Sequence, residues 1–196
     1  MRTLKLSFFA VLVVVLVSAS ALAADQYKID PNHSSATFSV RHNLISNVPG
    51  RFSEVNGTIN YDQADVTKSS VEAVIKVATI NTDNEGRDKH LKRADFFDAE
   101  KYPTLSFRSI NVKTTATDSL EVTGDLTIHS ITKRITVPVK NIGARVLPGI
   151  GEFAGFEATF DIDRRDYGIF GTRWSGNTVA IDPVLLIHLI IGGVRH

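Results

Sequence analysis

The sequence has no cysteine among its 196 residues. Thiol catalysis, thiolate-bound metals, iron–sulfur clusters and disulfide cross-links are therefore excluded. The fold must be held together by its hydrophobic core alone. A chain of this length can do so, because a domain of this size buries roughly 70% of the surface that its unfolded chain exposes.

The sequence also lacks an excess of charge of one sign, because it contains 22 basic and 21 acidic residues. Arg2 and Lys5 lie in an N-terminal segment whose removal would leave 20 basic residues against 21 acidic ones. A near-neutral chain without long basic runs has no electrostatic footprint for nucleic acid. We therefore expect no nucleic-acid partner.

Motifs of hydrolases and metal enzymes are absent as well. The sequence has no G-x-S-x-G, its six histidines show no H-x-H or H-x-x-x-H spacing, and the acids of residues 161–166 read as a solvated surface. We expect no catalytic residue, no cofactor and no metal. Because ligands can converge from distant strands, an envelope enzyme with a metal site of His42, His90 and His129 stays the alternative.

Residues 1–23 have the layout of a secretory signal peptide. Arg2 and Lys5 precede an apolar run over residues 6–17, and Ala21-Leu22-Ala23 offers the small residues that a signal peptidase reads. The run is short for a membrane span of about 20 residues, which argues against an uncleaved anchor. The segment predicts cleavage after Ala23 or Ala24. Export without cysteine favours a bacterial periplasm, where disulfides are available but optional.

Residues 24–196 read as a single domain made mostly of strands. In residues 36–42 every second side chain is apolar, which places Phe38, Val40 and His42 on one inner face. Similar alternation recurs from Val55, Val71, Leu120, Ile135 and Phe156, and Leu105, Phe107 and the C-terminal run bring the total to about eight strands. Short, turn-rich connections mean antiparallel neighbours. Eight such strands fit a sandwich or a closed barrel.

One segment interrupts the strands. Thr82-Asp83-Asn84-Glu85 is a capping box, and it predicts a helix over about residues 83–94. A single helix between barrel strands is commonly a lid or plug. Arg87 and His90 are three residues apart and so share one helix face, where they would suit an anionic or carbonyl head group. The alternative is an ordinary solvent-facing charged surface.

The predicted inner faces carry several small residues, namely Ala36, Gly57, Ala73, Gly124 and Ala158. Small residues on inner faces can leave room for a ligand, or they can mark twist and bulges in a filled core. The composition leaves both alternatives open.

The final strand is apolar on both faces. Residues 184–191 contain only aliphatic side chains apart from His188, so Leu186 and Ile190 would face outward if the strand closed a single barrel. An uncovered apolar face favours association, which predicts a possible homodimer through this strand.

The chain resembles the YceI-like family of bacterial polyisoprenoid-binding proteins over nearly all of residues 24–196. The motifs that carry the resemblance are residues 27–34 (YKIDPNHS), 38–42 (FSVRH), 50–52 (GRF), 80–91 (INTDNEGRDKHL), 94–98 (ADFFD), 101–104 (KYPT), 124–129 (GDLTIH) and 166–168 (DYG). The resemblance implies an all-β fold, an eight-stranded antiparallel lipocalin-like barrel with one inserted helix. It also implies an internal tunnel for a long isoprenoid, a polyprenyl phosphate or an isoprenoid quinone, and no catalytic activity.

Residues and resemblance together predict a periplasmic carrier or sequestering protein for an isoprenoid lipid. The alternative is an envelope enzyme that acts on such a lipid or uses a histidine-based metal site. The predicted tail-lining residues each lie on the apolar face of a strand: Phe38, Val40, Phe107, Leu126, Phe156 and Phe160. The predicted head-group residues are His42, at the end of one such face, and Arg87 and His90 on the helix.

Overall fold

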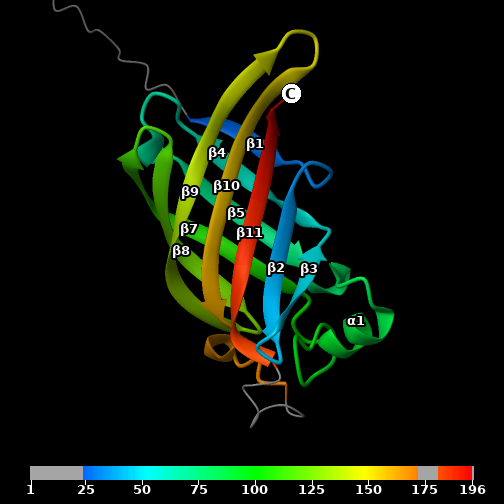
Figure 1. Ribbon diagram of the computed structural model, residues 1–196. Coiled ribbons are helices and arrows are strands. Elements are labelled where there is room, and N and C mark those ends of the chain that lie inside the picture. The colour runs from blue at the N-terminus through cyan, green and yellow to red at the C-terminus, as the bar shows by residue number, and fades with distance from the viewer. Residues whose placement is uncertain (1–23, 172–180, 196) are drawn as a thin grey trace, which may run out of the picture.

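Alternating apolar residues form antiparallel strands that close into an eight-stranded barrel (Figure 1). The computed structural model describes residues 24–171 and 181–195. The barrel strands, in their order around the sheet, are β1 (Asp25–Ile29), β4 (Val55–Tyr61), β5 (Ser70–Lys76), β7 (Thr104–Ala116), β8 (Ser119–Ile128), β9 (Ile131–Leu147), β10 (Gly151–Asp163) and β11 (Ile181–Arg195). Pairing of β1 with β11 closes the barrel, as the resemblance implied. The predicted signal peptide, residues 1–23, lies outside the described residues.

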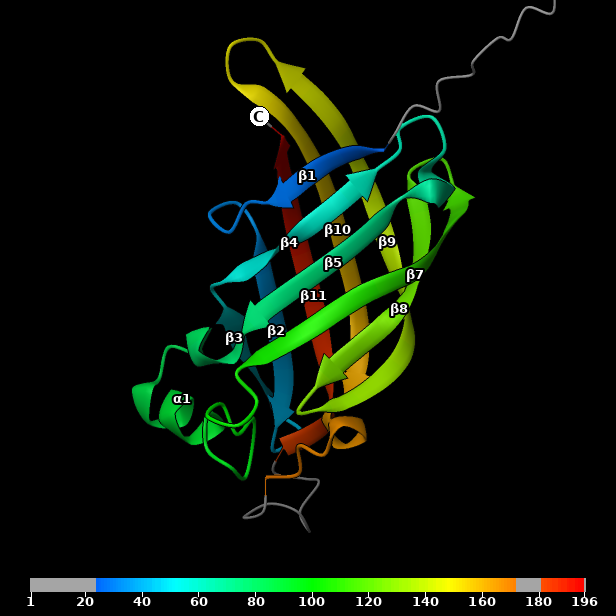
Figure 2. The ribbon, with the colours of Figure 1, turned by 180° about the vertical axis from the view of Figure 1, so that it is seen from behind.

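One long strand, β11, is shared between two partners on the same edge. Its C-terminal end pairs with β1, where Ile29 lies opposite Gly193. Its N-terminal two thirds pair with β2 (Ser35–His42), where Phe38 lies opposite Ile187. Strand β3 (Ser46–Phe52) and the two-residue β6 (Ile80–Asn81) extend the sheet beyond β2. The β2–β3 hairpin therefore widens the barrel wall at one end (Figure 2).

That end also carries the helix α1 (Glu85–Leu91) and the short 3₁₀ helix η3 (Arg164–Tyr167). Two further 3₁₀ turns, η1 (Val66–Lys68) and η2 (Val77–Thr79), flank β5. No helix in the described part of the chain has the length and apolar character needed to cross a membrane.

The helix is shorter than the predicted span of residues 83–94. Asp83 has a left-handed backbone (φ 57°), so the helix cannot include it. Asn84 is the N-cap, since its side-chain oxygen accepts a hydrogen bond from the Arg87 amide at 2.9 Å. Thr82, the expected cap, instead donates its hydroxyl to Asp88 at 2.6 Å. The helix ends at Leu91, and its last turn passes directly into a series of tight turns.

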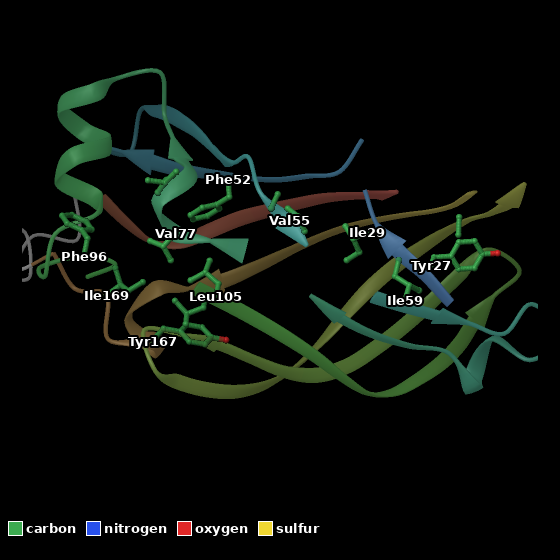
Figure 3. Packing of buried hydrophobic residues seen from close by; sticks show 14 of the residues in the cluster. Tyr27, Ile29, Phe52, Val55, Ile59, Val77, Phe96, Leu105, Tyr167 and Ile169 are labelled. Carbon is green, nitrogen blue, oxygen red and sulfur yellow. The ribbon is translucent and has the colours of Figure 1, made fainter. Parts of the chain in front are cut away.

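The buried core runs along the inside of the barrel (Figure 3). Phe96, Ile169 and Tyr167 lie toward the helix end, and Tyr27 and Ile59 lie toward the other. Each such side chain contributes about 1.5–3 kcal/mol by leaving water. A core of this kind holds the barrel without the disulfides that the sequence excludes.

Candidate ligand cavity

An apolar cavity of about 230 Å³ lies inside the barrel. Aliphatic or aromatic side chains from every barrel strand line it, among them Ile29, Ile59, Ile75, Phe107, Leu126, Ile135, Phe156 and Leu189. At the end far from the helix, Tyr61 packs edge-on against both Tyr27 and Phe156, with ring centroids 6.4 and 5.4 Å apart. The core is therefore not completely filled, which decides between the alternatives that the composition left open.

The predicted tail-lining residues lie on the inner surface. Phe38, Phe107, Leu126, Phe156 and Phe160 line the barrel cavity. Val40 lies nearer the end of β2 and lines the adjoining chamber instead. Alternation along each strand thus identified inner residues correctly, while their contact with a ligand stays a prediction.

The small inner residues divide into two groups. Ala36, Ala73 and Ala158 line the cavity and keep it open. Gly124 leaves no room, because a Cβ there would collide with the Phe107 ring and the Arg108 carbonyl oxygen. Gly57 is packed in the same way against the backbone of Glu72. For both glycines the second alternative therefore holds, because they admit close neighbours from adjacent strands.

A second space, the head chamber, has a volume of about 460 Å³ and lies between β2, α1 and η3. It shares Phe38, Phe97, Ile128, Ile162 and Leu185 with the barrel cavity, so the two spaces adjoin. The chamber alone falls within the roughly 300–1,000 Å³ typical of small-ligand pockets. Arg87 is exposed and lines it, so the chamber reaches the surface beside the helix.

All three predicted head-group residues, His42, Arg87 and His90, line the head chamber. Arg87 is fixed in place by Thr82, because its Nε donates to the threonine hydroxyl at 2.7 Å and its Nη2 donates to the carbonyl at 2.6 Å. No aspartate or glutamate is among the described residues that line the chamber. The chamber lining therefore has guanidinium and imidazole groups but no carboxylate, which suits an anionic or electron-rich group.

His90 is held by an acid behind the chamber wall. Its Nε2 lies 2.9 Å from a carboxylate oxygen of Asp95, and its ring packs edge-on against Phe96. Partial burial opposes ionisation of Asp95, but the hydrogen bond with His90 and nearby positive charge outweigh burial and hold the pKa of Asp95 below its ordinary value. The ring of His90 is thereby oriented by a carboxylate that stays ionised near neutral pH.

Sequence reasoning missed Arg164, a buried residue that also lines the head chamber. Its Nη1 donates to the carbonyls of Ile169 and Phe170 at 2.6 and 2.8 Å, and its Nη2 donates to Ile181 at 3.3 Å. Burial lowers the pKa of Arg164, although a guanidinium stays charged in proteins. The alternation that turns Phe156 inward extends to residue 164 and could have identified it.

The alternative histidine metal site is not assembled. His129 lies in the turn between β8 and β9, and its ring packs against Tyr102 with centroids 4.4 Å apart. It does not line the head chamber with His42 and His90. Within residues 24–171 and 181–195, no group of three or more histidine, aspartate or glutamate side chains could hold a metal ion.

The two faces of β11 differ as the alternation predicts. Leu185, Ile187, Leu189 and Ile191 line the cavity. Leu186 and Ile190 are exposed on the outside, separated by His188, whose Nε2 lies 3.2 Å from Glu157 on β10. The apolar outer face exists, and self-association through it stays a prediction.

Comparison with known proteins identifies similar sequences over most of the chain. The model of the YceI-like domain matches residues 27–187. A UPF0312 protein of Vibrio cholerae is 39% identical over 158 residues, which cover 80% of this chain and 83% of that protein. A UPF0312 protein of Pseudomonas putida is 36% identical over 182 residues, covering 91% and 95%.

Solved structures share the fold. The YceI protein of Campylobacter jejuni is 29% identical with a TM-score of 0.71, covering 80% of this chain and 90% of that one. BcnA of Burkholderia cenocepacia is 21% identical with a TM-score of 0.75, covering 84% and 98%. A polyisoprenoid binding domain from Saccharophagus degradans, implicated in plant cell wall breakdown, is 15% identical with a TM-score of 0.64, covering 87% and 98%.

Proposed function

Because the chain belongs to the YceI-like family, we propose that it binds a long isoprenoid lipid inside the barrel and serves as a periplasmic carrier or sequestering protein for it. The Saccharophagus domain, which is described as polyisoprenoid-binding, supports this class of ligand through the shared fold. The predicted signal peptide supports the periplasmic location.

The observation that carries the proposal is the separation of apolar and basic surfaces between two adjoining spaces. An apolar cavity takes a hydrocarbon tail, and the adjoining chamber offers guanidinium and imidazole groups to a polar head. Burial of about ten methylene equivalents of tail would contribute roughly 8 kcal/mol before ordering costs. That gross figure corresponds to a micromolar dissociation constant, so the tail dominates affinity.

The head group is proposed to be a phosphate or a quinone. Arg87 presents a fixed guanidinium to the chamber and keeps its Nη1 for a ligand, because the described residues engage only its Nε and Nη2. A phosphate would accept charge-assisted hydrogen bonds there, and a quinone carbonyl would accept weaker ones. Arg87, His42 and His90 would thus tune selectivity more than total affinity.

The decisive experiment is mass spectrometry of organic extracts and metal content from protein purified out of its own envelope. We expect a stoichiometric isoprenoid phosphate or quinone, and a large reduction of it in Ala158→Phe protein purified in parallel. Protein that carries no isoprenoid and binds none on addition would contradict the proposal. Bound metal or turnover of an added isoprenoid would favour an envelope enzyme instead.

A further inference from the structure

Among the large apolar side chains exposed at the helix end of the barrel, three lie on the turn after β2 or directly after η3. On the turn between β2 and β3, Leu44 is 55% and Ile45 is 87% exposed. Phe170, which follows η3, is 50% exposed. These side chains contribute little to the stability of the hydrophobic core, because none of them is buried in it. We call Leu44, Ile45 and Phe170 the rim residues.

The rim residues lie beside residues that line the head chamber. Ile45 donates its amide to the carbonyl of His42 at 3.2 Å, and His42 lines the chamber and pairs with Ile181. The guanidinium of Arg164 bonds the carbonyls of both Ile181 and Phe170. One buried arginine therefore joins both sides of the rim. Figure 2 shows the turn after β2, η3 and the start of β11 together at this end.

The turn holds Leu44 in an unfavourable conformation. Asn43 and Leu44 have φ of 51° and 62°, both left-handed. Hairpin turns of this kind favour asparagine followed by glycine, because a side chain with a Cβ is strained there. A leucine at this position is unfavourable for the backbone, and its exposed side chain adds little to the hydrophobic core.

The charge of the hairpin is all of one sign. No aspartate or glutamate occurs between Asp30 and Glu54, a stretch that includes all of β2 and β3. Arg41 and Arg51 are exposed there, and neither forms an ion pair with any described residue. The hairpin therefore combines an apolar tip with positive charge, a combination that is attracted to anionic lipid head groups.

The opposite end of the barrel provides a contrast. The long β9–β10 hairpin projects there and exposes Val146 (70%) and Ile150 (66%) at its tip (Figure 1). Its strands carry acids as well as bases, and Glu152 beside the tip pairs with Arg195. The tip of the β9–β10 hairpin therefore exposes apolar side chains to a similar extent as the β2–β3 hairpin. Its strands carry charges of both signs, however, and it lies away from the head chamber.

We propose that the rim residues dock the head chamber onto the surface of a bilayer containing anionic phospholipid. Leu44, Ile45 and Phe170 enter the interfacial region, and Arg41 lies beside them at the head-group level. An isoprenoid could then pass between bilayer and cavity without crossing water. That purpose rests on the proposed function, whereas the docking itself does not.

The test is cosedimentation of the mature protein with vesicles of phosphatidylcholine and about 30% phosphatidylglycerol, the anionic component. The vesicles contain no isoprenoid. We expect binding that weakens in high salt or with phosphatidylcholine alone. The double variant Leu44→Asn/Ile45→Ser should bind at least about tenfold more weakly, since asparagine suits the left-handed turn and the apolar tip is lost. The matched control Val146→Ser/Ile150→Ser should bind like the wild type.

Three results would overturn the proposal: no binding by the wild type, wild-type binding by the tip variant, or lost binding by the control. A fourth is a change of oligomeric state in the tip variant with vesicle binding retained, which would assign the tip to a second copy of the chain. Binding of geranylgeranyl phosphate in detergent, measured on the same variants, separates failure of docking from failure of the proposed lipid binding.

Discussion

Replacing Ala158 with phenylalanine should block the proposed tail site. Ala158 lies midway along β10, between Leu189 of β11 and Val139 of β9, and its side chain lines the cavity. A phenyl ring there would point into the open space and divide the inner end of the cavity from the head chamber. The perturbation adds bulk where room exists, so the barrel should still fold.

The expected loss of binding affinity can be worked out from the volumes of the added ring and of the barrel cavity. A benzene ring fills an apolar cavity of about 150 Å³, and the barrel cavity has about 230 Å³. The ring would therefore exclude more than half of the tail. Loss of about five of ten methylene equivalents costs roughly 4 kcal/mol, which weakens binding about a thousandfold.

Binding is best measured by calorimetry with geranyl, farnesyl and geranylgeranyl phosphate. The wild type should gain affinity with each added isoprene unit, while the Ala158→Phe variant should gain little beyond the shortest ligand. Thr159→Phe is the matched control, because the neighbouring side chain is exposed on the outer face of the same strand. A folded Ala158→Phe protein, checked by thermal unfolding, that binds geranylgeranyl phosphate like the wild type would refute the internal tail site.

Other predictions concern the head chamber, the outer face and processing. Arg87→Ala should cost about 1–3 kcal/mol in binding a polyprenyl phosphate and much less for a quinone, as competitive titration would measure; equal losses would argue against a head-group role. Replacing Leu186 and Ile190 with lysine should yield a folded monomer, and a wild type that sediments as a monomer at high micromolar concentration would refute self-association. Intact mass of the exported protein should place its first residue at Ala24 or Asp25, and a species retaining Arg2 would contradict both cleavage and export.

Strand β10 shows how far alternation can predict the site. Its period of two placed Phe156, Ala158 and Phe160 on the inner face, and all three line the cavity. The same period extends to Arg164, which was not predicted as a site residue. The two-residue alternation depends only on neighbouring positions in one strand, so it predicts well whether a side chain points into or out of the barrel.

The shape of the cavity was not predictable in the same way. The sequence did not decide whether Gly124 leaves space, and the ring of Phe107, from the next strand, occupies that space. Gly50 on β3 is covered likewise by the ring of Phe38 on β2. These contacts depend on register and ring rotamer across strands, which a single sequence does not specify. The helix limits failed for a related reason, since Thr82 bonds Asp88 and leaves capping to Asn84.

The pairing of β1 with β11 bears on when a ligand can enter. The first and last strands of the barrel are neighbours, and Arg195 forms an ion pair with Asp25 across that seam. During synthesis the chain emerges from its N-terminus, so β1, β2 and β10 are made before β11, the strand with which all three pair. Until then the sheet is an open, curved surface with no enclosed volume. Loading must therefore follow the folding of β11 into the barrel, and a chain truncated before residue 181 would lose the compartment itself.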